Sequence, residues 1–235
     1  MEFKKLFEKI RRKISGRMTS QEYTEYLRSL GARIGDRVSF IDPKTTKVDR
    51  QAAFLITIGN DVTVTGGVTV LAHDFSYSVL NEVYGVMPQV HRETKIGNNV
   101  FIGREAIILM GSDIGDNCVI GAGAVVSGKV PSNTVWGGNP ARQICTLEEF
   151  KSKRTDERYL QGAVVYAKNI IERLGRKPTY DEMGVYIGLF APRTEEFKPY
   201  FNKLSRLPKV SENVWNVKPL YKDLDDFLKQ NNLLK

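Results

Sequence analysis

The chain has 235 residues, a formal net charge of +8 and two cysteines. That length allows one or two domains with a substantial buried core. The cysteines form no CxxC pair and no histidine cluster lies near them, so we expect neither a disulfide framework nor a metal site, and Cys118 is interpreted as a buried thiol. No apolar run reaches the roughly 18 residues of a membrane span, and the N-terminus is too charged for a signal peptide. We therefore expect a cytoplasmic protein.

The positive charge lies toward the two ends of the sequence. Residues 1–50 carry +6, residues 51–147 carry −2, and residues 148–235 carry +4. A nucleic-acid-binding protein usually has a basic stripe interleaved with aromatic residues on a recognisable module. Because the middle of this chain, which holds the repeat described below, is slightly acidic, we expect no nucleic-acid partner.

Residues 1–17 predict an amphipathic helix surrounded by lysine and arginine. Its apolar side chains recur at three- and four-residue intervals, at Phe3, Leu6, Phe7, Ile10 and Ile14. Such a helix commonly packs on the body of its own protein, and this one would also suit an anionic membrane surface, where a peripheral contact would form. Thr19 and Glu22 then give a capping-box pattern, which predicts a second short helix ending near Gly31.

A six-residue repeat occupies the middle of the chain. Aliphatic residues recur at every sixth position, and small or aliphatic residues follow each of them four places later: Ile96, Ile102, Ile108, Ile114, Ile120 and Val126, then Val100, Ala106, Ser112, Cys118, Ala124 and Val130. A helical stripe recurs every three to four residues, so this period excludes a helix. A short fixed repeat of this kind is typical of a β-helix, in which each hexad makes one strand and one corner and three hexads close a triangular coil.

The same period extends toward the N-terminus and is then interrupted once. Ile58 lies four hexads after Ile34, with irregular hexads between them, and the pattern is clear from Ile58 to Val70. Ile96 follows Val70 by 26 residues, which is not a multiple of six, so the chain must leave the coil over about Phe75 to Thr94. Long excursions from a regular scaffold often carry function.

Two polar residues mark the point of departure. Asp74 falls at the next expected inward position, four after Val70, and it follows His73, one of the two histidines of the protein.

After Val135–Arg142, which ends the repeat, the pattern becomes helical. We predict helices from Leu147, over 156–175, after a capping box at Thr179 and Glu182, and over 220–233, with four prolines breaking the remainder. The expected parts are an N-terminal helical segment (1–31), a β-helix domain (32–145) and a mostly helical C-terminal extension (146–235).

Five segments together resemble the left-handed β-helix acyltransferases, and most of all their maltose and galactoside O-acetyltransferases. These segments are ITIGNDVTV (56–64), VLAHDFS (70–76), KIGNNVFIG (95–103), DIGDNCVIGAGAVV (113–126) and VWGGNPARQI (135–144). The resemblance covers about residues 34–144. It implies a mainly β fold, namely a left-handed parallel β-helix with an extruded loop. The left-handed sense of the coils is an exception to the right-handed crossover that usually joins parallel strands. The resemblance also implies a homotrimer with active sites between protomers, and acetyl-CoA as the acyl donor.

His73 matches the catalytic histidine of that family, which lies just before the extruded loop. The resemblance implies that His73 removes a proton from an acceptor hydroxyl, which then attacks the thioester of acetyl-CoA. General-base help of this kind is typically worth about 10²–10⁴-fold in rate. His91, at the far end of the loop, is the rival base, and its alternative is a solvated loop residue.

The family places acetyl-CoA along the solenoid, in the groove between two protomers. The matching positions here are Arg104, Ala122, Ser127, Lys129 and Arg142. Ala122 and Ser127 are small enough for pantetheine to approach the backbone, and the two arginines suit phosphate, although many surface arginines are only solvated. Lys129 is displaced by one place from the lysine of the family pattern.

Two aspartates are candidates for binding the acceptor. Asp42 occupies roughly the place of a sugar-binding aspartate of the family, and its alternative is a turn-capping role before Pro43. Asp74 would steady His73 or bind the sugar, and its alternative is a hydrogen bond to the backbone at the start of the loop.

We therefore predict an acetyl-CoA-dependent O-acetyltransferase that acts on a sugar or oligosaccharide hydroxyl, in capsule or other surface-polysaccharide synthesis. Two other enzyme classes keep the same repeat and histidine, namely amino-sugar N-acetyltransferases and antibiotic-inactivating acetyltransferases. A non-catalytic β-helix that forms a structural or binding trimer is the alternative outside enzymes.

Overall fold

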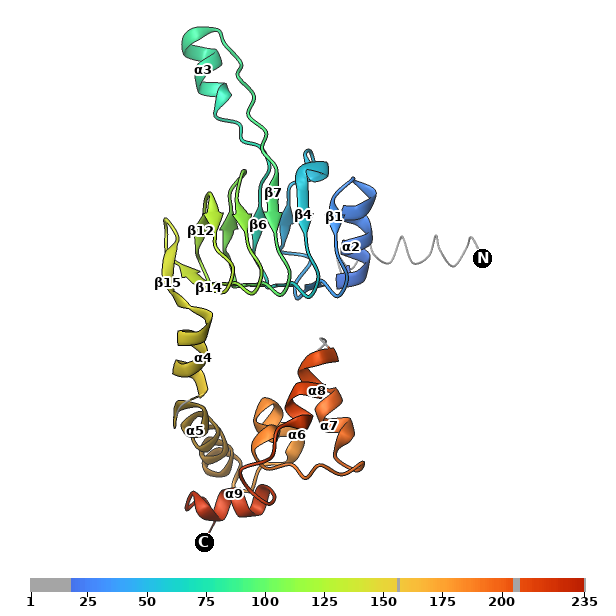
Figure 1. Ribbon diagram of the computed structural model, residues 1–235, viewed down its shortest axis with the longest axis vertical. Coiled ribbons are helices and arrows are strands. Elements are labelled where there is room, and N and C mark those ends of the chain that lie inside the picture. The colour runs from blue at the N-terminus through green and yellow to red at the C-terminus, as the bar shows by residue number, and fades with distance from the viewer. Residues whose placement is uncertain (1–17, 156, 205–207, 235) are drawn as a thin grey trace, which may run out of the picture. The chain divides into compact units, whose positions relative to one another are not determined.

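A computed structural model describes residues 18–155, 157–204 and 208–234 (Figure 1). The helix predicted over residues 1–17, and the membrane contact proposed for it, lie outside these ranges. The described residues fall into two compact units, the first ending at Phe150 and the second beginning at Lys151. Each unit has its own buried core.

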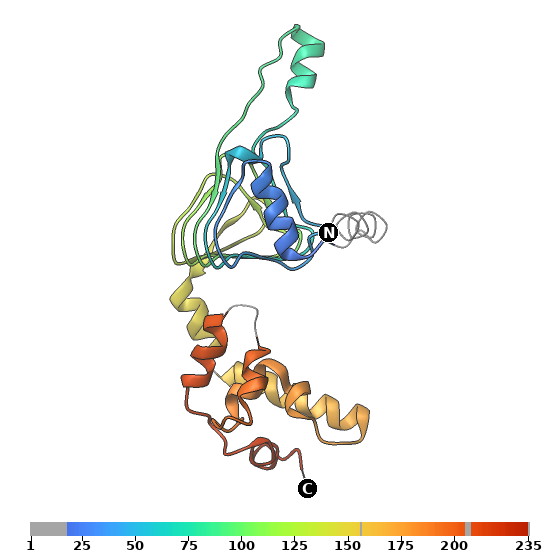
Figure 2. The same ribbon diagram turned by 90° about the vertical axis from the view of Figure 1, so that its right-hand side faces the viewer.

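The first unit is a left-handed parallel β-helix whose coils are triangular in section (Figure 2). Three sheets form its sides. Sheet A holds β1 (Arg33–Ile34), β4 (Ile56–Ile58), β7 (Thr94–Ile96), β10 (Asp113–Ile114) and β13 (Lys129–Val130). Sheet B holds β2 (Ser39–Phe40), β5 (Thr63–Val64), β8 (Phe101–Ile102), β11 (Val119–Ile120), β14 (Thr134–Gly137) and β15 (Arg142–Thr146). Sheet C holds β3 (Lys47–Val48), β6 (Thr69–Val70), β9 (Ile107–Ile108) and β12 (Val125–Val126).

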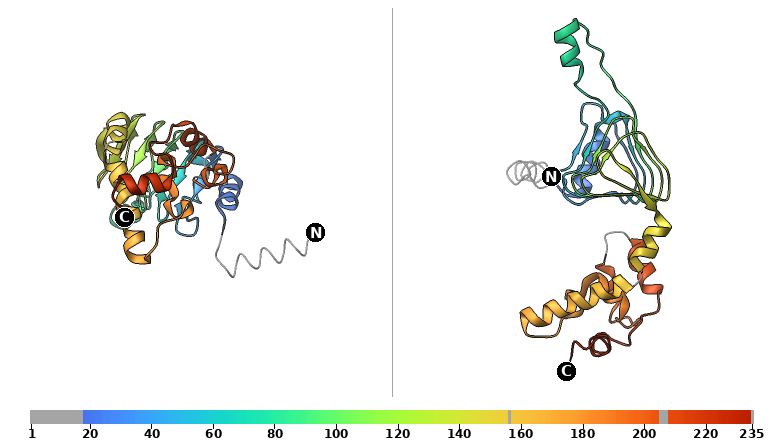
Figure 3. Two further views of the ribbon diagram at one scale, coloured as in Figure 1. Left: turned by 90° about the horizontal axis from the view of Figure 1, so that it is seen from below. Right: turned by 90° about the vertical axis from the view of Figure 1, so that its left-hand side faces the viewer.

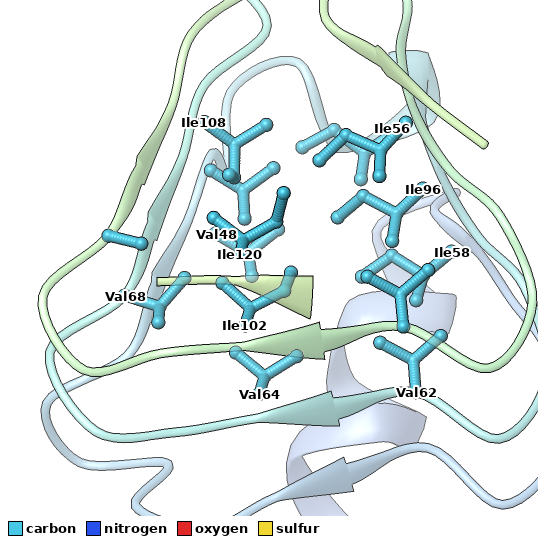
Figure 4. Close-up of a cluster of buried hydrophobic side chains, with 14 of the residues drawn as sticks. Val48, Ile56, Ile58, Val62, Val64, Val68, Ile96, Ile102, Ile108 and Ile120 are labelled. Carbon is cyan, nitrogen blue, oxygen red and sulfur yellow. The ribbon is translucent and has the colours of Figure 1, made fainter. Parts of the chain in front are cut away.

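The hexad count correctly predicts the core of this unit. All twelve repeat positions between Ile96 and Val130 are at most 2% exposed. Equivalent residues of successive coils stack in parallel register, so that Val64 lies beside Ile102 and Ile102 beside Ile120. Figure 4 shows these side chains meeting inside the triangle. Strands this short are stable because each coil covers the apolar interior of the next one.

Glycine follows many inward residues because the corners of successive coils stack closely. A Cβ placed on Gly97 would lie 2.8 Å from the carbonyl carbon of Gly115, the equivalent residue of the next coil. In the same row of corners, the residue two places after Gly97 or its equivalent has a left-handed backbone conformation. Asn99, Asn117 and Asn133 occupy this position with φ values of 53°, 57° and 62°. Asparagine tolerates this conformation better than most residues with a Cβ.

The prediction of four hexads between Ile34 and Ile58 is wrong, because this stretch makes a single coil of three strands. Phe40 and Val48 are the inward residues of consecutive sides and lie eight residues apart, and Val48 and Ile58 are ten apart. The extra residues form a turn after β2 and the 3₁₀ helix η1 (Ala53–Leu55). The spacings between Ile34 and Ile58 add up to the length of four hexads. The six-residue count therefore continues correctly at Ile58, although the strands between these two residues do not follow it.

Helix α2 (Ser20–Ser29) covers the N-terminal end of the coils (Figure 2). Thr19 and Glu22 form the predicted capping box, and the helix ends before Gly31. Leu27 is fully buried, and the ring of Tyr23 packs edge-on against Phe40 at 4.9 Å. At the other end, β14 and β15 pair antiparallel and terminate the parallel stacking, as the sequence 135–142 predicted.

The predicted excursion is confirmed. The chain leaves the coil after His73 and returns at β7, and the outgoing and returning segments pair at His73 and His91. We call residues 74–91 the arm. It carries α3 (Tyr77–Tyr84), which has no buried residue, and it projects from one corner of the triangle (Figures 1 and 3).

The second unit is helical. Helix α4 (Leu147–Thr155) crosses the boundary between the two units. The elements that follow it are α5 (Glu157–Leu174), α6 (Tyr180–Met183), η2 (Gly184–Leu189), α7 (Lys198–Asn202), α8 (Pro208–Asn216) and α9 (Leu224–Gln230). The helix predicted over 156–175 ends as expected at Gly175, and the capping box at Thr179 opens α6. The last helix is shorter than the predicted 220–233, because the Asp223 side chain accepts the Asp226 N–H and starts α9 there.

Candidate active site

The strands of sheet C end at one corner of the triangle, which we call the C–A corner because the chain turns there into sheet A. Four residues stack along this corner, one in each coil. Asp49 donates its N–H to Val70 O at 2.8 Å, Leu71 to Ile108 O at 2.9 Å, and Leu109 to Val126 O at 2.9 Å. Ser127 follows Val126 in the last coil. His73 lies two residues beyond Leu71, so the stacking of coils brings it next to Asp49.

A carboxylate and an imidazole form the centre of the site. His73 Nδ1 makes a short hydrogen bond to Asp49 Oδ2. The side chains are 12% and 2% exposed, respectively. Asp49 is itself held by backbone groups, since Oδ2 accepts the Ala72 N–H at 3.1 Å and Oδ1 accepts the N–H groups of Gln51 and Ala52 at 3.1 and 3.2 Å. The carboxylate is thus fixed before any ligand binds.

The charge state of Asp49 sets the tautomer of His73. Burial raises the pKa of Asp49, but the N–H of Ala72, the ring of His73 and the N–H of Ala52 act in the opposite direction and together lower it. An ionised carboxylate only accepts hydrogen bonds, so Nδ1 carries the proton and Nε2 keeps its lone pair. Nε2 has no hydrogen-bond partner among the described residues. The atom is buried in the single chain, and its lone pair is not engaged by any described residue.

Two aromatic groups hold the plane of the His73 ring. Phe75 approaches it edge-on, with ring centroids 4.8 Å apart, and His91 stacks on it at 5.7 Å with 21° between the planes. The base of the arm is closed by a hydrogen bond from the Arg92 N–H to Ala72 O at 3.0 Å. His91, the rival base, is thus a neighbour of His73.

Asp74 does not occupy the position predicted for it. Ala72, which is fully buried, takes the inward place, because the chain turns outward two residues earlier than the hexad count implies. Asp74 Oδ1 accepts the N–H and the hydroxyl of Ser76 at 2.9 and 2.6 Å. These bonds, the hydroxyl first, lower the pKa of Asp74. The role of steadying His73 belongs to Asp49, and Asp74 instead shapes the start of the arm.

Asp42 lies at a different corner from His73. It follows β2, where sheet B turns into sheet C, and we call this the B–C corner. Its Oδ2 accepts the hydroxyl of Thr45 at 2.8 Å and its carbonyl accepts the N–H of Thr46 at 3.1 Å. The turn role considered from the sequence is therefore present, and one chain does not bring Asp42 to His73.

The residues predicted to bind the donor are divided between the two corners. Arg104 and Ala122 are exposed at the B–C corner in adjacent coils, where Gly123 donates its N–H to Arg104 O at 2.8 Å. Arg142 belongs to the same end, because it pairs with Gly137 in β15. Ser127 and Lys129 are exposed at the C–A corner, two coils beyond His73.

Sequence reasoning missed Asp49, the residue that orients the base. It lies 24 residues before His73, in the irregular coil, where hexads could not be counted. The signal that could have found it is Val48, an aliphatic residue followed directly by a carboxylate. Val48 aligns with Val70 in the parallel register. Knowledge of that register would have placed Asp49 under Leu71 and next to the loop departure.

Among the helices described, none combines the length and the apolar character needed to cross a bilayer.

A β-helix of stacked hexads, with an oriented imidazole where the arm departs, defines an acyltransferase of the hexapeptide type. Residues 93–128 match the family model described as bacterial transferase hexapeptide (six repeats). The chain is also 40% identical over 131 residues to Protein CapG of Staphylococcus aureus, an alignment that covers 54% of this chain and 73% of CapG. It therefore belongs to the hexapeptide-repeat transferase family.

Two further relatives resemble parts of the chain. The galactoside O-acetyltransferase of Escherichia coli K12 is 41% identical over 110 residues, which cover 42% of this chain and 51% of that protein, so the chain spans about half the length of this relative. The solved structure of a galactoside acetyltransferase in complex with coenzyme A is 26% identical, with a TM-score of 0.43 over 56% of this chain and 73% of that one.

Proposed function

We propose that the protein is an acetyl-CoA-dependent O-acetyltransferase that moves an acetyl group to a sugar hydroxyl, in capsule or other surface-polysaccharide synthesis. The observation that carries this proposal is the Asp49–His73 pair, with its unpartnered Nε2 at the departure of the arm. The similarity to a galactoside O-acetyltransferase supports the choice of a sugar hydroxyl as acceptor.

The geometry supports the following reaction. His73 Nε2 takes the proton of the acceptor hydroxyl while the hydroxyl oxygen attacks the thioester carbonyl carbon of acetyl-CoA. The tetrahedral intermediate then collapses, the carbon–sulfur bond breaks, and the imidazolium returns its proton to the departing thiolate of CoA. Asp49 stabilises the imidazolium while it exists and keeps the lone pair on Nε2 in the neutral ring. Acetyl ester and free CoA are the products.

The surface around the predicted donor positions is suited to an extended thioester. A Cβ on Gly123 or Gly128 would meet no atom within 4 Å, so the backbone beside Ala122 and Ser127 is open to a ligand. Arg104, Lys129 and Arg142 are exposed and could reach the phosphates of CoA.

We propose a homotrimer because the predicted site residues lie at two separate corners of a single chain. Arg104, Ala122, Arg142 and Asp42 belong to the B–C corner, whereas His73, Asp74, Ser127 and Lys129 belong to the C–A corner. Placing the C–A corner of one protomer against the B–C corner of the next would unite the base with the remaining contacts. Three such contacts close a ring with three equivalent sites. Sedimentation equilibrium tests this assembly.

A peripheral membrane contact on the cytoplasmic side is proposed for residues 1–17. Their basic amphipathic pattern would hold the enzyme near a lipid-linked acceptor. Binding to anionic vesicles should weaken when these residues are removed, and unchanged binding would refute the contact.

An acetyl-transfer screen tests the function itself. The panel contains mono- and oligosaccharides, amino sugars and a hydroxyl-bearing antibiotic, and free CoA is measured. We expect turnover with a sugar hydroxyl, and transfer only to an amine or to the antibiotic would support an alternative enzyme class instead. His73→Ala should abolish turnover while acetyl-CoA binding and the oligomer persist. Near-normal turnover in that variant would exclude His73 as the base.

A further inference from the structure

The second unit contains two adjoining hollows that the transfer chemistry does not use. The larger has a volume of 630 Å³ and the smaller 190 Å³. Tyr180 and Tyr200 line both of them and form the wall between them. A volume of several hundred Å³ is in the range of small-molecule sites.

This aromatic wall is held rigidly. The Tyr180 hydroxyl accepts the N–H of Leu224 at 3.2 Å, and its ring packs edge-on against Phe197 at 4.8 Å. The ring of Tyr200 lies 5.9 Å from that of Tyr180. Lys203 Nζ lies 5.4 Å from the centre of the Tyr200 ring. A ligand would therefore meet rings that are already held in place, with little side-chain entropy lost on binding.

The charges that line the hollows balance each other. Arg176, Lys177, Asp223 and Asp225 line the larger hollow, where Arg176 also pairs with Glu182 at 2.7 Å, and Lys203 and Asp181 line the smaller one. Lys177 and Asp225 form an ion pair at 2.9 Å, as do Lys203 and Asp181. A site for phosphates or other anions would carry net positive charge, and a cation site net negative charge.

These ion pairs still have hydrogen-bonding capacity to offer. An ammonium has three donors and a carboxylate about four acceptor positions, so a single pair leaves several of them for a ligand. A purely apolar ligand would cover these groups without replacing their water, which is costly. A neutral ligand with apolar C–H faces and many hydroxyl groups would pack on the rings and form hydrogen bonds with the charged side chains. Sugars have this chemistry.

We propose that the two hollows form a carbohydrate subsite that binds sugar units of a neutral oligosaccharide acceptor, with a pyranose against the Tyr180–Tyr200 wall. The inference deepens the proposed function and rests on it for the identity of the ligand as the acceptor. A long acceptor held at this subsite would keep its other hydroxyl groups at high local concentration around the enzyme. A monosaccharide would gain nothing from the second unit.

Direct binding tests the subsite without turnover. Full-length His73→Ala protein is titrated with galactotetraose in a calorimeter, alone and combined with Tyr200→Ala. We expect Tyr200→Ala to weaken binding about tenfold, as loss of an aromatic contact of this kind would. Tyr166→Ala is the matched control, because Tyr166 is an exposed tyrosine of the same unit outside both hollows. Equal affinity in all three proteins, or no binding to the His73→Ala parent, would overturn the subsite.

A second variant keeps the proposal testable if Tyr200→Ala does not fold. Asp181→Asn removes one rim charge at an exposed position, and we expect it to weaken galactotetraose binding several-fold with an unchanged unfolding transition. With His73 intact, Tyr200→Ala should raise the KM for a long galactan but not for methyl galactoside, and kcat should stay the same. An equal rise for both acceptors would refute a separate subsite. If glycan binding depends on Tyr200 but no acceptor is acetylated, the subsite stands and the transferase proposal fails.

Discussion

At the scale of single residues, a buried carboxylate behind an imidazole has two effects on that ring. It selects the tautomer with a free Nε2, and it stabilises the positive charge that the ring acquires after it takes a proton. Asp49 can exert both because three backbone N–H groups, those of Gln51, Ala52 and Ala72, fix its orientation. The arm begins directly after His73, so the base is held at the junction of a rigid coil and an extruded segment.

Replacing Asp49 by asparagine should reduce kcat without unfolding the protein. The amide keeps the size of the side chain but carries no charge and can donate to Nδ1, which would favour the tautomer with a protonated Nε2. Since the whole general-base contribution is typically about 10²–10⁴-fold, we expect a loss of about 100-fold in kcat. Asp36→Asn, an exposed residue away from the C–A corner, is the control. Steady-state rates of CoA release would measure both, and comparable kcat values in them would refute the role of Asp49.

The Asp49–His73 pair should also make stability depend on acid. The pKa of Asp49 is lowered in the folded chain, so its contribution to stability is complete above the unfolded value of about 3.9 and is lost as pH falls through the lower folded value. Urea unfolding of the wild type should weaken more steeply below about pH 4 than that of Asp49→Asn. Parallel pH curves for the two proteins would contradict the shift.

Sequence reasoning reached His73 and not its partner for a physical reason. His73 was visible because the hexad count breaks beside it, whereas Asp49 was hidden because its coil contains two irregular corners. The count also misplaced Asp74, since it assumed a complete hexad where the chain turns outward directly after the buried Ala72. Contacts between coils depend on register, and the register of an irregular coil is set by packing that the sequence period does not contain.

At the scale of elements, the corners of the β-helix are stabilised by a ladder of asparagine side chains. Asn99 Nδ2 donates to Asn117 Oδ1 at 2.9 Å, and Asn117 Nδ2 donates to Asn133 Oδ1 at 3.0 Å. The same residues adopt positive φ. Each asparagine therefore both tolerates the corner and links one coil to the next.

Asn117→Ala should destabilise the β-helix by about 2–4 kcal/mol. Alanine in a left-handed conformation costs about 1–2 kcal/mol, and two exposed hydrogen bonds are worth about 0.5–1 kcal/mol each. Asn117→Gly separates these effects, because glycine relieves the conformational cost and loses only the ladder. Urea unfolding at fixed protein concentration measures both variants. If glycine and alanine cost the same, the positive φ carries no energy at this corner.

In the second unit, one arginine joins several turns of backbone. The Arg193 guanidinium donates to the carbonyls of Trp215 at 2.9 Å, Gly188 at 2.9 Å and Val217 at 2.8 Å, and it lies 4.6 Å from the ring centre of Phe201. Burial lowers the pKa of Arg193. The carbonyl dipoles compensate for part of that burial and connect η2 to the end of α8.

Arg193→Met should destabilise the second unit by about 2–4 kcal/mol, because it leaves several partly buried carbonyl groups without their donor. Arg193→Lys keeps the charge but lacks the planar fork that reaches several carbonyls together, so we expect an intermediate loss. Thermal unfolding followed by far-ultraviolet circular dichroism would measure the helical transition in each variant. Full stability in the methionine variant would mean that these carbonyls are satisfied in another way.

At the scale of the whole molecule, the chain contains two chemically different cores. The first is built from small aliphatic residues stacked in register, such as Ile102 and Ile120. The second is rich in aromatic residues, and the rings of Phe190 and Phe227 stack at 5.1 Å. The hexad period predicted the first core residue by residue over 96–130, where the geometry is a strict repeat, but not in the irregular coil before Ile58. The helical unit has no repeat, so its sequence predicted where several helices begin and end but not how they pack.

Separate cores predict separate unfolding transitions in the full-length protein. Calorimetry should show two, and Ile102→Ala should lower only the one that belongs to the β-helix, while Phe190→Ala lowers only the other. Each truncation of a fully buried side chain costs roughly 2–5 kcal/mol, enough to move its transition by roughly 10 °C. Urea-induced loss of acetyl-CoA binding would follow the first transition, since the predicted donor contacts belong to the β-helix. A single transition shifted equally by both variants would show that the two units unfold as one cooperative body.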